Sequence, residues 1–219
     1  MYIPDDFRID RLDLLHEAMA KHSFAMLVTH GVQGLQAHHL PFELDVSSSE
    51  FGRLKAHVAR KNPIWQQSKN GDEVLIVFQM GDAYISPNWY PSKQQHHQQV
   101  PTWNYKVVHA WGKISIHDDE HYVRGVVARL TRQHEVTQAK PWKMGDAPKS
   151  YIEAMLQHIV GIEIEITRLQ GQFKLGQNKD YVDILGAVEG LTQSGHTEMA
   201  EAMHEVAHAK LHNSNVQEK

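Results

Sequence analysis

The most constraining feature of the sequence is a strict two-residue alternation in its last third. Within residues 159–169, apolar side chains alternate with polar ones, in the order Ile162, Glu163, Ile164, Glu165, Ile166, Thr167. Successive side chains of a strand point to opposite faces, so this pattern predicts a half-buried β-strand. Such a strand needs neighbours that pair with its edges and cover its apolar face.

Other segments supply those neighbours. Residues 24–29 and 35–44, separated by Gly31 and Gly34, predict a hairpin, and four further strands are expected at 51–59, 74–78, 83–86 and 106–117. Helical patterns cover 10–22, 118–134, 147–157 and 180–211, the last interrupted near 194–195. We expect a mainly β fold with flanking helices (α+β), in which an antiparallel sheet forms a closed or nearly closed barrel because closure removes exposed edges. The barrel domain spans residues 1–179 with inserted helices, and a helical extension, 180–219, packs on it.

Composition excludes several classes of protein. The 219 residues carry 22 basic and 26 acidic side chains, and the formal charge of −4 argues against a strongly basic nucleic-acid binder. There is no cysteine, so thiolate metal sites and cysteine nucleophiles are absent. No apolar stretch approaches the ~18 residues of a membrane span, and residues 1–6 show no basic region followed by an apolar one, so no signal peptide is expected. We expect a cytoplasmic protein with no membrane partner.

One motif suggests metal chemistry. His204 and His208 flank Glu205 in the pattern H-E-x-x-H on an expected helix, the spacing of zinc metalloproteases. The extended pattern would place a further histidine at position 214, which is Ser214. With 17 histidines in the chain, chance pairs are common. A solvated helix face is therefore favoured, no metal ligand is assigned, and a zinc hydrolase remains a remote alternative.

Three other segments could bind a ligand. Residues 55–63 run from a strand into the cations Arg60 and Lys61, an arrangement that suits a phosphate but also an ordinary solvated turn. Residues 84–111 contain six aromatic side chains among prolines, which suits the wall of a planar-ligand pocket or the packing of a long loop. Residues 171–179 offer Lys174 and Gln177 as donors, or simply end a strand.

Seven pieces of the sequence, taken in order, resemble the PaiB family of FMN-binding negative transcriptional regulators, within the FMN-binding split-barrel superfamily. The pieces are residues 1–4, 39–42, 56–63, 83–90, 100–105, 108–112 and 173–178, which extend over nearly the whole chain. Gly176 and the His-rich tract at 94–99 depart from the family pattern.

The resemblance implies an antiparallel split β-barrel of the FMN-binding type, FMN as cofactor and a homodimer with flavin at its interface. The phosphate would be held by Ala56, His57, Arg60, Lys61 and Asn62. The ring system would lie along His38, His39 and Pro41. The pocket would be closed by Trp89, Trp103, Asn104, Lys174 and Gln177.

The same resemblance implies a regulatory role, and two readings of function follow. The first is a flavin-binding regulator, for which DNA is a possible partner that the acidic charge does not support. The second is a flavin-dependent oxidoreductase that acts on a small molecule with NAD(P)H. No general acid or base stands out in the sequence, and catalytic residues are not assigned.

Overall fold

The structure is a computed structural model that describes the backbone of residues 1–217 and the side chains of residues 1–212. Its strands are β1 (Arg8–Ile9), β2 (Phe24–Gly31), β3 (Gly34–Pro41), β4 (Glu43–Asp45), β5 (Arg53–Ala59), β6 (Glu73–Ile85), β7 (Thr102–His117) and β8 (Ile159–Lys174). Its α-helices are α1 (Leu12–Lys21), α2 (Ile64–Gln67), α3 (Lys93–His96), α4 (Glu120–Glu135), α5 (Lys149–Leu156), α6 (Tyr181–Gln193) and α7 (Thr197–Gln217). Three short 3-10 turns are η1 (Asp5–Phe7), η2 (Pro87–Trp89) and η3 (Met144–Asp146).

The strands form a sheet in the order β3-β2-β6-β7-β8-β5-β4, and β1 pairs with β8. The pairs β1–β8, β2–β3, β2–β6, β4–β5 and β5–β8 are antiparallel. The fold is the expected antiparallel split barrel with flanking helices. Within residues 1–217 the hydrogen-bonded order ends at β3 and β4, so the sheet does not close on itself.

The chain forms two compact units, each assembled from separate segments. We call Arg11–Phe78 with Val108–Leu169 the barrel unit, and Met1–Asp10, Gln79–Val107 and Gln170–Lys219 the terminal unit. The three longest strands, β6, β7 and β8, cross the boundaries and so contribute residues to both units.

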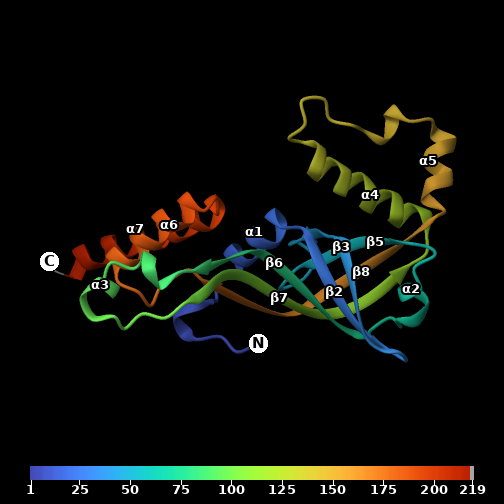
Figure 1. Ribbon diagram of the computed structural model, residues 1–219. Helices are drawn as coiled ribbons and strands as arrows, with labels where there is room; N and C mark the ends of the chain where they lie inside the picture. The colour runs from blue at the N-terminus through green and yellow to red at the C-terminus, as the bar shows by residue number, and fades with distance from the viewer. Residues whose placement is uncertain (218–219) are drawn as a thin grey trace. The chain divides into compact units, whose positions relative to one another are not determined.

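The core of the barrel unit is built from the alternation that the sequence predicts. The apolar side chains at Ile162 and Ile164 on β8, Leu54 on β5 and Ile76 on β6 are fully buried. Helix α4 lies beside β5 and begins where the Asp119 side chain accepts a hydrogen bond from the Tyr122 N–H at 2.8 Å, a normal N-cap. After α4 the chain folds back along the helix through η3 into α5 (Figure 1).

One expectation about the strands was wrong. The sequence predicts two strands around a turn at Gly81 and Asp82, whereas β6 is continuous from Glu73 to Ile85. Buried positions are even-numbered up to Met80 and odd-numbered from Ala83, so one extra residue is inserted there. Gly81 takes a φ of 75°, which is the glycine-favoring conformation of a bulge. A bulge therefore replaces the turn and lets one strand continue.

The terminal unit has its own core under two packed helices. Helices α6 and α7 lie side by side (Figure 1) and bury their facing side chains. The buried cluster consists of Ala83, Ile85, Tyr90, Leu175, Ile184, Ala187, Leu191, Met199, Ala200, Met203 and Ala207. Burial at roughly 25 cal/mol per Å² of apolar surface makes this cluster the main stabilising contact between α6, α7 and the strand ends of the unit.

Candidate functional site

The expected phosphate-binding segment starts on β5, where side chains alternate in environment. Ala56 is completely buried in the core, so only its backbone can face a ligand. The next side chain, His57, points to the other face of the strand and is half-buried. Its Nδ1 atom is buried and has no hydrogen-bond partner in the described part of the chain. Burial lowers the pKa of His57 from its usual 6.5, so the imidazole is neutral near neutral pH.

The turn after β5 holds the two cations, but they differ in availability. The Arg60 guanidinium donates to both carboxylate oxygens of Asp118, at 2.9 and 2.6 Å, and to the backbone oxygen of Gln157 at 2.7 Å. The Arg60 pairing lowers the pKa of Asp118. Lys61 is exposed, and within residues 1–212 its side chain forms no ion pair. The free cation of the turn is therefore Lys61, whereas Arg60 is held by its own chain.

Asn62 has a structural role in the same turn. Its side-chain oxygen accepts a hydrogen bond from the Ile64 N–H at 3.1 Å, where α2 begins. The turn is also fixed by Trp65, whose indole N–H donates to the Arg60 carbonyl at 2.9 Å. These bonds set the position of Lys61 and engage the Asn62 side-chain oxygen, whereas its Nδ2 amide group keeps its two N–H donors for a ligand.

The candidates expected along the flavin ring lie on β3. His38 is half-buried, and its Nε2 atom is buried without a partner among the described residues. Burial, with a smaller contribution from His39, lowers the pKa of His38. His39 is exposed and stacks on Phe24 with ring centroids 6.3 Å apart. Pro41 ends the strand directly opposite Phe24 in the hairpin register.

Two of these candidates, Pro41 and His57, line the same cavity. It has a volume of about 290 Å³ and is also lined by side chains from α4 and the following loop, namely Val127, Leu130, Thr131, His134, Glu135 and Trp142. The volume is close to the lower limit of small-molecule pockets, roughly 300 Å³. The structure thus brings His57, expected near the phosphate, and Pro41, expected along the flavin ring, to one hollow in the barrel unit.

The α4 and loop residues of this cavity were missed by the sequence analysis. The α4 side chains carry only the ordinary helical pattern, and Trp142 stands in a stretch without periodicity. Their common property is position in space, which depends on how the loop folds back onto α4. No local pattern of residues could have revealed it.

The remaining flavin candidates lie in the terminal unit, and two of them, Trp89 and Asn104, serve its packing. Trp89 lies against α6, where a Cβ on Gly190 would come within 2.3–2.5 Å of the indole ring. Asn104 is 1% exposed, and its amide N–H lies 3.2 Å from the Met203 sulfur. Trp103, by contrast, is 54% exposed and meets Tyr84 edge to face, with centroids 5.9 Å apart. Of the two tryptophans, Trp103 offers an open aromatic surface.

Lys174 and Gln177 are engaged locally at the end of β8. The Lys174 ammonium donates to the Thr102 hydroxyl, and burial, followed by the charge of Lys179, lowers its pKa. The Gln177 amide accepts from the Leu175 N–H at 2.8 Å and donates to the Phe173 carbonyl at 2.6 Å. Gln177 therefore stabilises the turn after the strand, the alternative that the sequence left open.

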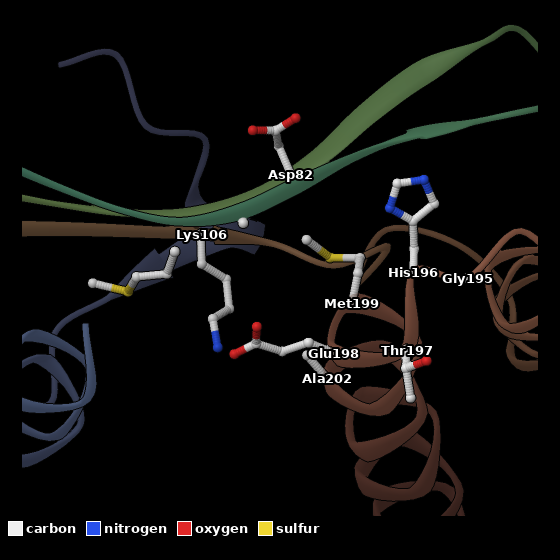
Figure 2. Close-up of a pocket in the computed structure, with 10 residues that line it drawn as sticks. Asp82, Lys106, Gly195, His196, Thr197, Glu198, Met199 and Ala202 are labelled. Carbon is white, nitrogen blue, oxygen red and sulfur yellow. The ribbon is translucent and has the colours of Figure 1, made fainter. Parts of the chain in front are cut away.

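The terminal unit also contains a small polar hollow that no flavin candidate lines. It has a volume of about 190 Å³ between β6, β7 and the start of α7. Figure 2 shows the charged ends of Lys106 and Glu198 turned toward one another, with Asp82 on the strand side. Asp82 accepts a hydrogen bond from the Gln79 amide at 2.9 Å. This volume is below that of ordinary ligand pockets.

The H-E-x-x-H motif lies on α7. His204 and His208 are exposed, with their Nε2 atoms 3.3 Å apart. The described part of the chain contains no group of three or more side chains that could hold a metal ion. A catalytic zinc needs three protein ligands, so the motif supplies a solvated pair of histidines there. Position 214 lies outside the residues with described side chains.

Comparison with known proteins decides the family. The family described as "Putative FMN-binding domain" matches residues 1–168. The chain belongs to this FMN-binding family. Its cofactor is FMN, and the resemblance to PaiB is confirmed by full-length similarity to a curated relative. This relative is the protease synthase and sporulation protein PAI 2 of Bacillus subtilis, which is 29% identical over 96% of this chain and 98% of its own length.

Other relatives support the family and the fold. An uncharacterised protein of Emericella nidulans is 33% identical over 74% of this chain and 76% of its own length. A conserved hypothetical protein of Mycobacterium tuberculosis has a similar structure, with a TM-score of 0.55 and 12% identity over 80% of this chain and 91% of that one. The FAD and heme binding protein of Mycobacterium smegmatis has a TM-score of 0.53 and 10% identity over 76% and 73% of the two chains. At these identities the structural likeness shows the fold alone.

The barrel unit of this FMN-binding protein has groups that fit a flavin. Buried polar atoms are normally hydrogen-bonded, and His57, which lines the cavity of about 290 Å³, has a buried Nδ1 without a partner that the polar edge of a ring could satisfy. His38 also has a buried nitrogen without a partner among the described residues, but it does not line this cavity. Lys61 supplies a free cation for a phosphate.

In the part of the chain that the structure describes, no helix is long and apolar enough to cross a membrane.

Proposed function

We propose that this FMN-binding protein is a flavin-dependent regulator whose FMN lies along β5. The observation that carries the proposal is the cavity of about 290 Å³ against His57, which has a buried Nδ1 without a partner. The ring would lie toward Pro41 and His57, and the phosphate toward the turn at Lys61. His57 lies two residues before the end of β5 at Ala59, ~7 Å along the strand, and the turn with Lys61 follows directly.

Each residue of this site has a definite role in the proposal. His57, kept neutral by burial, offers the ring a hydrogen bond instead of a charge. Lys61 neutralises the phosphate, and Arg60 holds the turn in place through Asp118. Val127 and Leu130 exclude water from the ring side of the cavity. FMN itself would supply the capacity to accept and donate electrons.

Regulation is the role that the similarity to PAI 2 supports, because that relative is named for protease synthesis and sporulation. We also propose that the chain forms a homodimer, as the resemblance to PaiB implies, and that it acts in the cytoplasm. Direct DNA binding gains no support from the formal charge of −4. The regulatory signal would therefore pass through the flavin-bound protein and a partner, rather than through a DNA-reading surface.

The phosphate site is tested by comparing FMN with riboflavin, which lacks the phosphate. We expect the wild type to bind FMN at least about tenfold more tightly, as one charged contact contributes ~1.5–3 kcal/mol. Lys61→Gln should remove most of this difference. Lys69→Gln, an exposed lysine just beyond α2, is the matched control and should preserve it.

Visible absorption and flavin fluorescence report both affinities in one titration. Equal affinity of the wild type for FMN and riboflavin would refute the phosphate assignment, and absence of FMN binding would refute the site as a whole. The regulatory role needs a separate test in cells. A deletion strain should recover its transcript profile with the wild-type gene but not with the Lys61→Gln variant, and equal recovery by both would show that regulation does not need the flavin.

A further inference from the structure

A second and larger cavity lies on another side of α4 in the barrel unit. Its volume is about 550 Å³, well inside the range of roughly 300–1,000 Å³ typical of small-molecule sites. It is bounded by the last two turns of α4 and by the loop that folds back along the helix toward η3 (Figure 1). None of the flavin candidates lines it.

The walls of this cavity are mostly apolar. The apolar lining residues are Ala128 and Val136, with Pro141, Trp142 and Met144 from the loop and η3. Met144 also packs against the buried cluster of Val123, Ile152 and Leu156, so this wall is anchored to the helices. Trp142 is 41% exposed, which leaves a broad aromatic surface open to the cavity. A flat apolar molecule would bury this surface and gain from aromatic contact.

The polar groups of the cavity give it a charge preference. Thr131, Arg132, Glu135 and Lys143 line it, which makes two cations and one carboxylate. The Glu135 carboxylate already accepts a hydrogen bond from the Trp142 backbone N–H at 2.8 Å and so fastens the loop to the end of α4. Neither Arg132 nor Lys143 forms an ion pair within residues 1–212. The formal charge of the lining is therefore positive by one, with both cations outside ion pairs beside an aromatic wall.

The two cavities on α4 share three lining residues: Thr131, Glu135 and Trp142. We propose that the 550 Å³ cavity is a binding site for a small planar, apolar molecule with one anionic group, such as an aromatic carboxylate. Its apolar part lies on Trp142 and its anion faces Arg132. That this ligand lies beside the flavin rests on the proposed function, whereas its binding in the 550 Å³ cavity does not. In that position the ligand is either the effector or the reaction partner of the flavin.

The probes that test this site are 1-naphthoate and its uncharged analogue 1-naphthalenemethanol, measured by calorimetry on the full chain. We expect the wild type to bind the naphthoate with a Kd below about 1 mM and ~10-fold more tightly than the alcohol. Arg132→Gln should make the two affinities equal. Arg124→Gln is the matched control, because Arg124 lies on the same helix outside the cavity and pairs with Glu120. It should leave the preference intact.

A second variant tests the location of the ligand by filling the cavity. Ala128→Phe should abolish naphthoate binding while FMN affinity, which reports a correct fold, is preserved. If that variant does not fold, the two arginine variants still decide. No naphthoate binding by the wild type, equal effects of Arg132→Gln and Arg124→Gln, or undiminished binding by folded Ala128→Phe would each overturn the proposal. Naphthoate binding without FMN binding would instead refute the proposed function alone.

Discussion

The buried carboxylate of Asp183 holds the loop before β7 in place, and its removal gives a quantitative prediction. Asp183 lies in the first turn of α6 and is 3% exposed. It accepts three hydrogen bonds, from the Ser92 N–H at 3.0 Å, the Ser92 hydroxyl at 2.6 Å and the Gln99 amide at 3.0 Å. Lys179 in turn donates to the Gln99 side-chain oxygen at 2.7 Å. The His-rich tract at 94–99 is thus bracketed by bonds to one carboxylate.

The size of the effect follows from these bonds. Hydrogen bonds to charged groups contribute about 1.5–3 kcal/mol each, and they are not additive. Asp183→Ala leaves all three donors without this acceptor, but Ser92 and Gln99 are only half-buried and regain some water. We expect a loss of about 3 kcal/mol in the free energy of unfolding. Asp183→Asn keeps the shape and one acceptor oxygen, so it should cost about half as much.

Urea denaturation followed by tryptophan fluorescence measures this loss. At a slope near 3 kcal/mol per M, Asp183→Ala should lower the midpoint by about 1 M. Glu189→Ala, at an exposed position on the same helix, should change stability by less than about 0.5 kcal/mol. Ser92→Ala combined with Asp183→Asn should show a coupling energy above about 0.5 kcal/mol. A midpoint for Asp183→Ala equal to that of Glu189→Ala would refute the role given to the carboxylate.

Two further predictions concern helix packing and pH. Gly190→Ala should lower the free energy of unfolding, measured by urea denaturation, by about 2 kcal/mol, because its Cβ would come within 2.3–2.5 Å of the Trp89 ring. Gly145→Ala is the control and should leave stability almost unchanged, since a Cβ there would meet nothing within 4 Å. Equal losses in the two variants would contradict this packing. Because the pKa of His57 is lower in the folded chain than its usual 6.5, the unfolded chain binds more protons just below pH 6.5, and stability should fall as the pH drops through that range. His57→Gln should flatten this dependence, and an unchanged pH profile would contradict the burial argument.

The sequence predicted the elements well where one face of each is buried. The alternation around Ile164, the hairpin and the capped helix after Asp119 all appear in the structure. The second strand of the hairpin ends earlier than expected, at Pro41, and Glu43–Asp45 form β4, which pairs with β5. Burial of one face requires apolar residues at a regular spacing, so the local sequence pattern is enough to find these elements. The sequence erred at Gly81, where it predicted a turn, because glycine at positive φ serves a turn and a bulge equally well.

The candidate site could be predicted only in part. The basic turn after β5 and the family resemblance pointed to His57 and Lys61, and both side chains remain available to a ligand. The engagement of Arg60 with Asp118 could not be read from the sequence, because 58 positions separate the two residues. The partners of Gln177 lie within four positions along the chain, so a local role could be expected from the sequence. Which backbone groups it bonds depends on the geometry of the turn, which the sequence does not give.

The sequence by itself determined which segments are strands and helices, the absence of thiol chemistry, and the family with its FMN cofactor. Only the tertiary structure decided which polar groups are already satisfied and where cavities remain. Buried positions recur at a regular spacing along each helix or strand, so a short stretch of sequence is enough to identify the element. A cavity on α4, or a carboxylate that occupies an arginine, depends on atoms brought together from distant segments, and no local pattern specifies those distances.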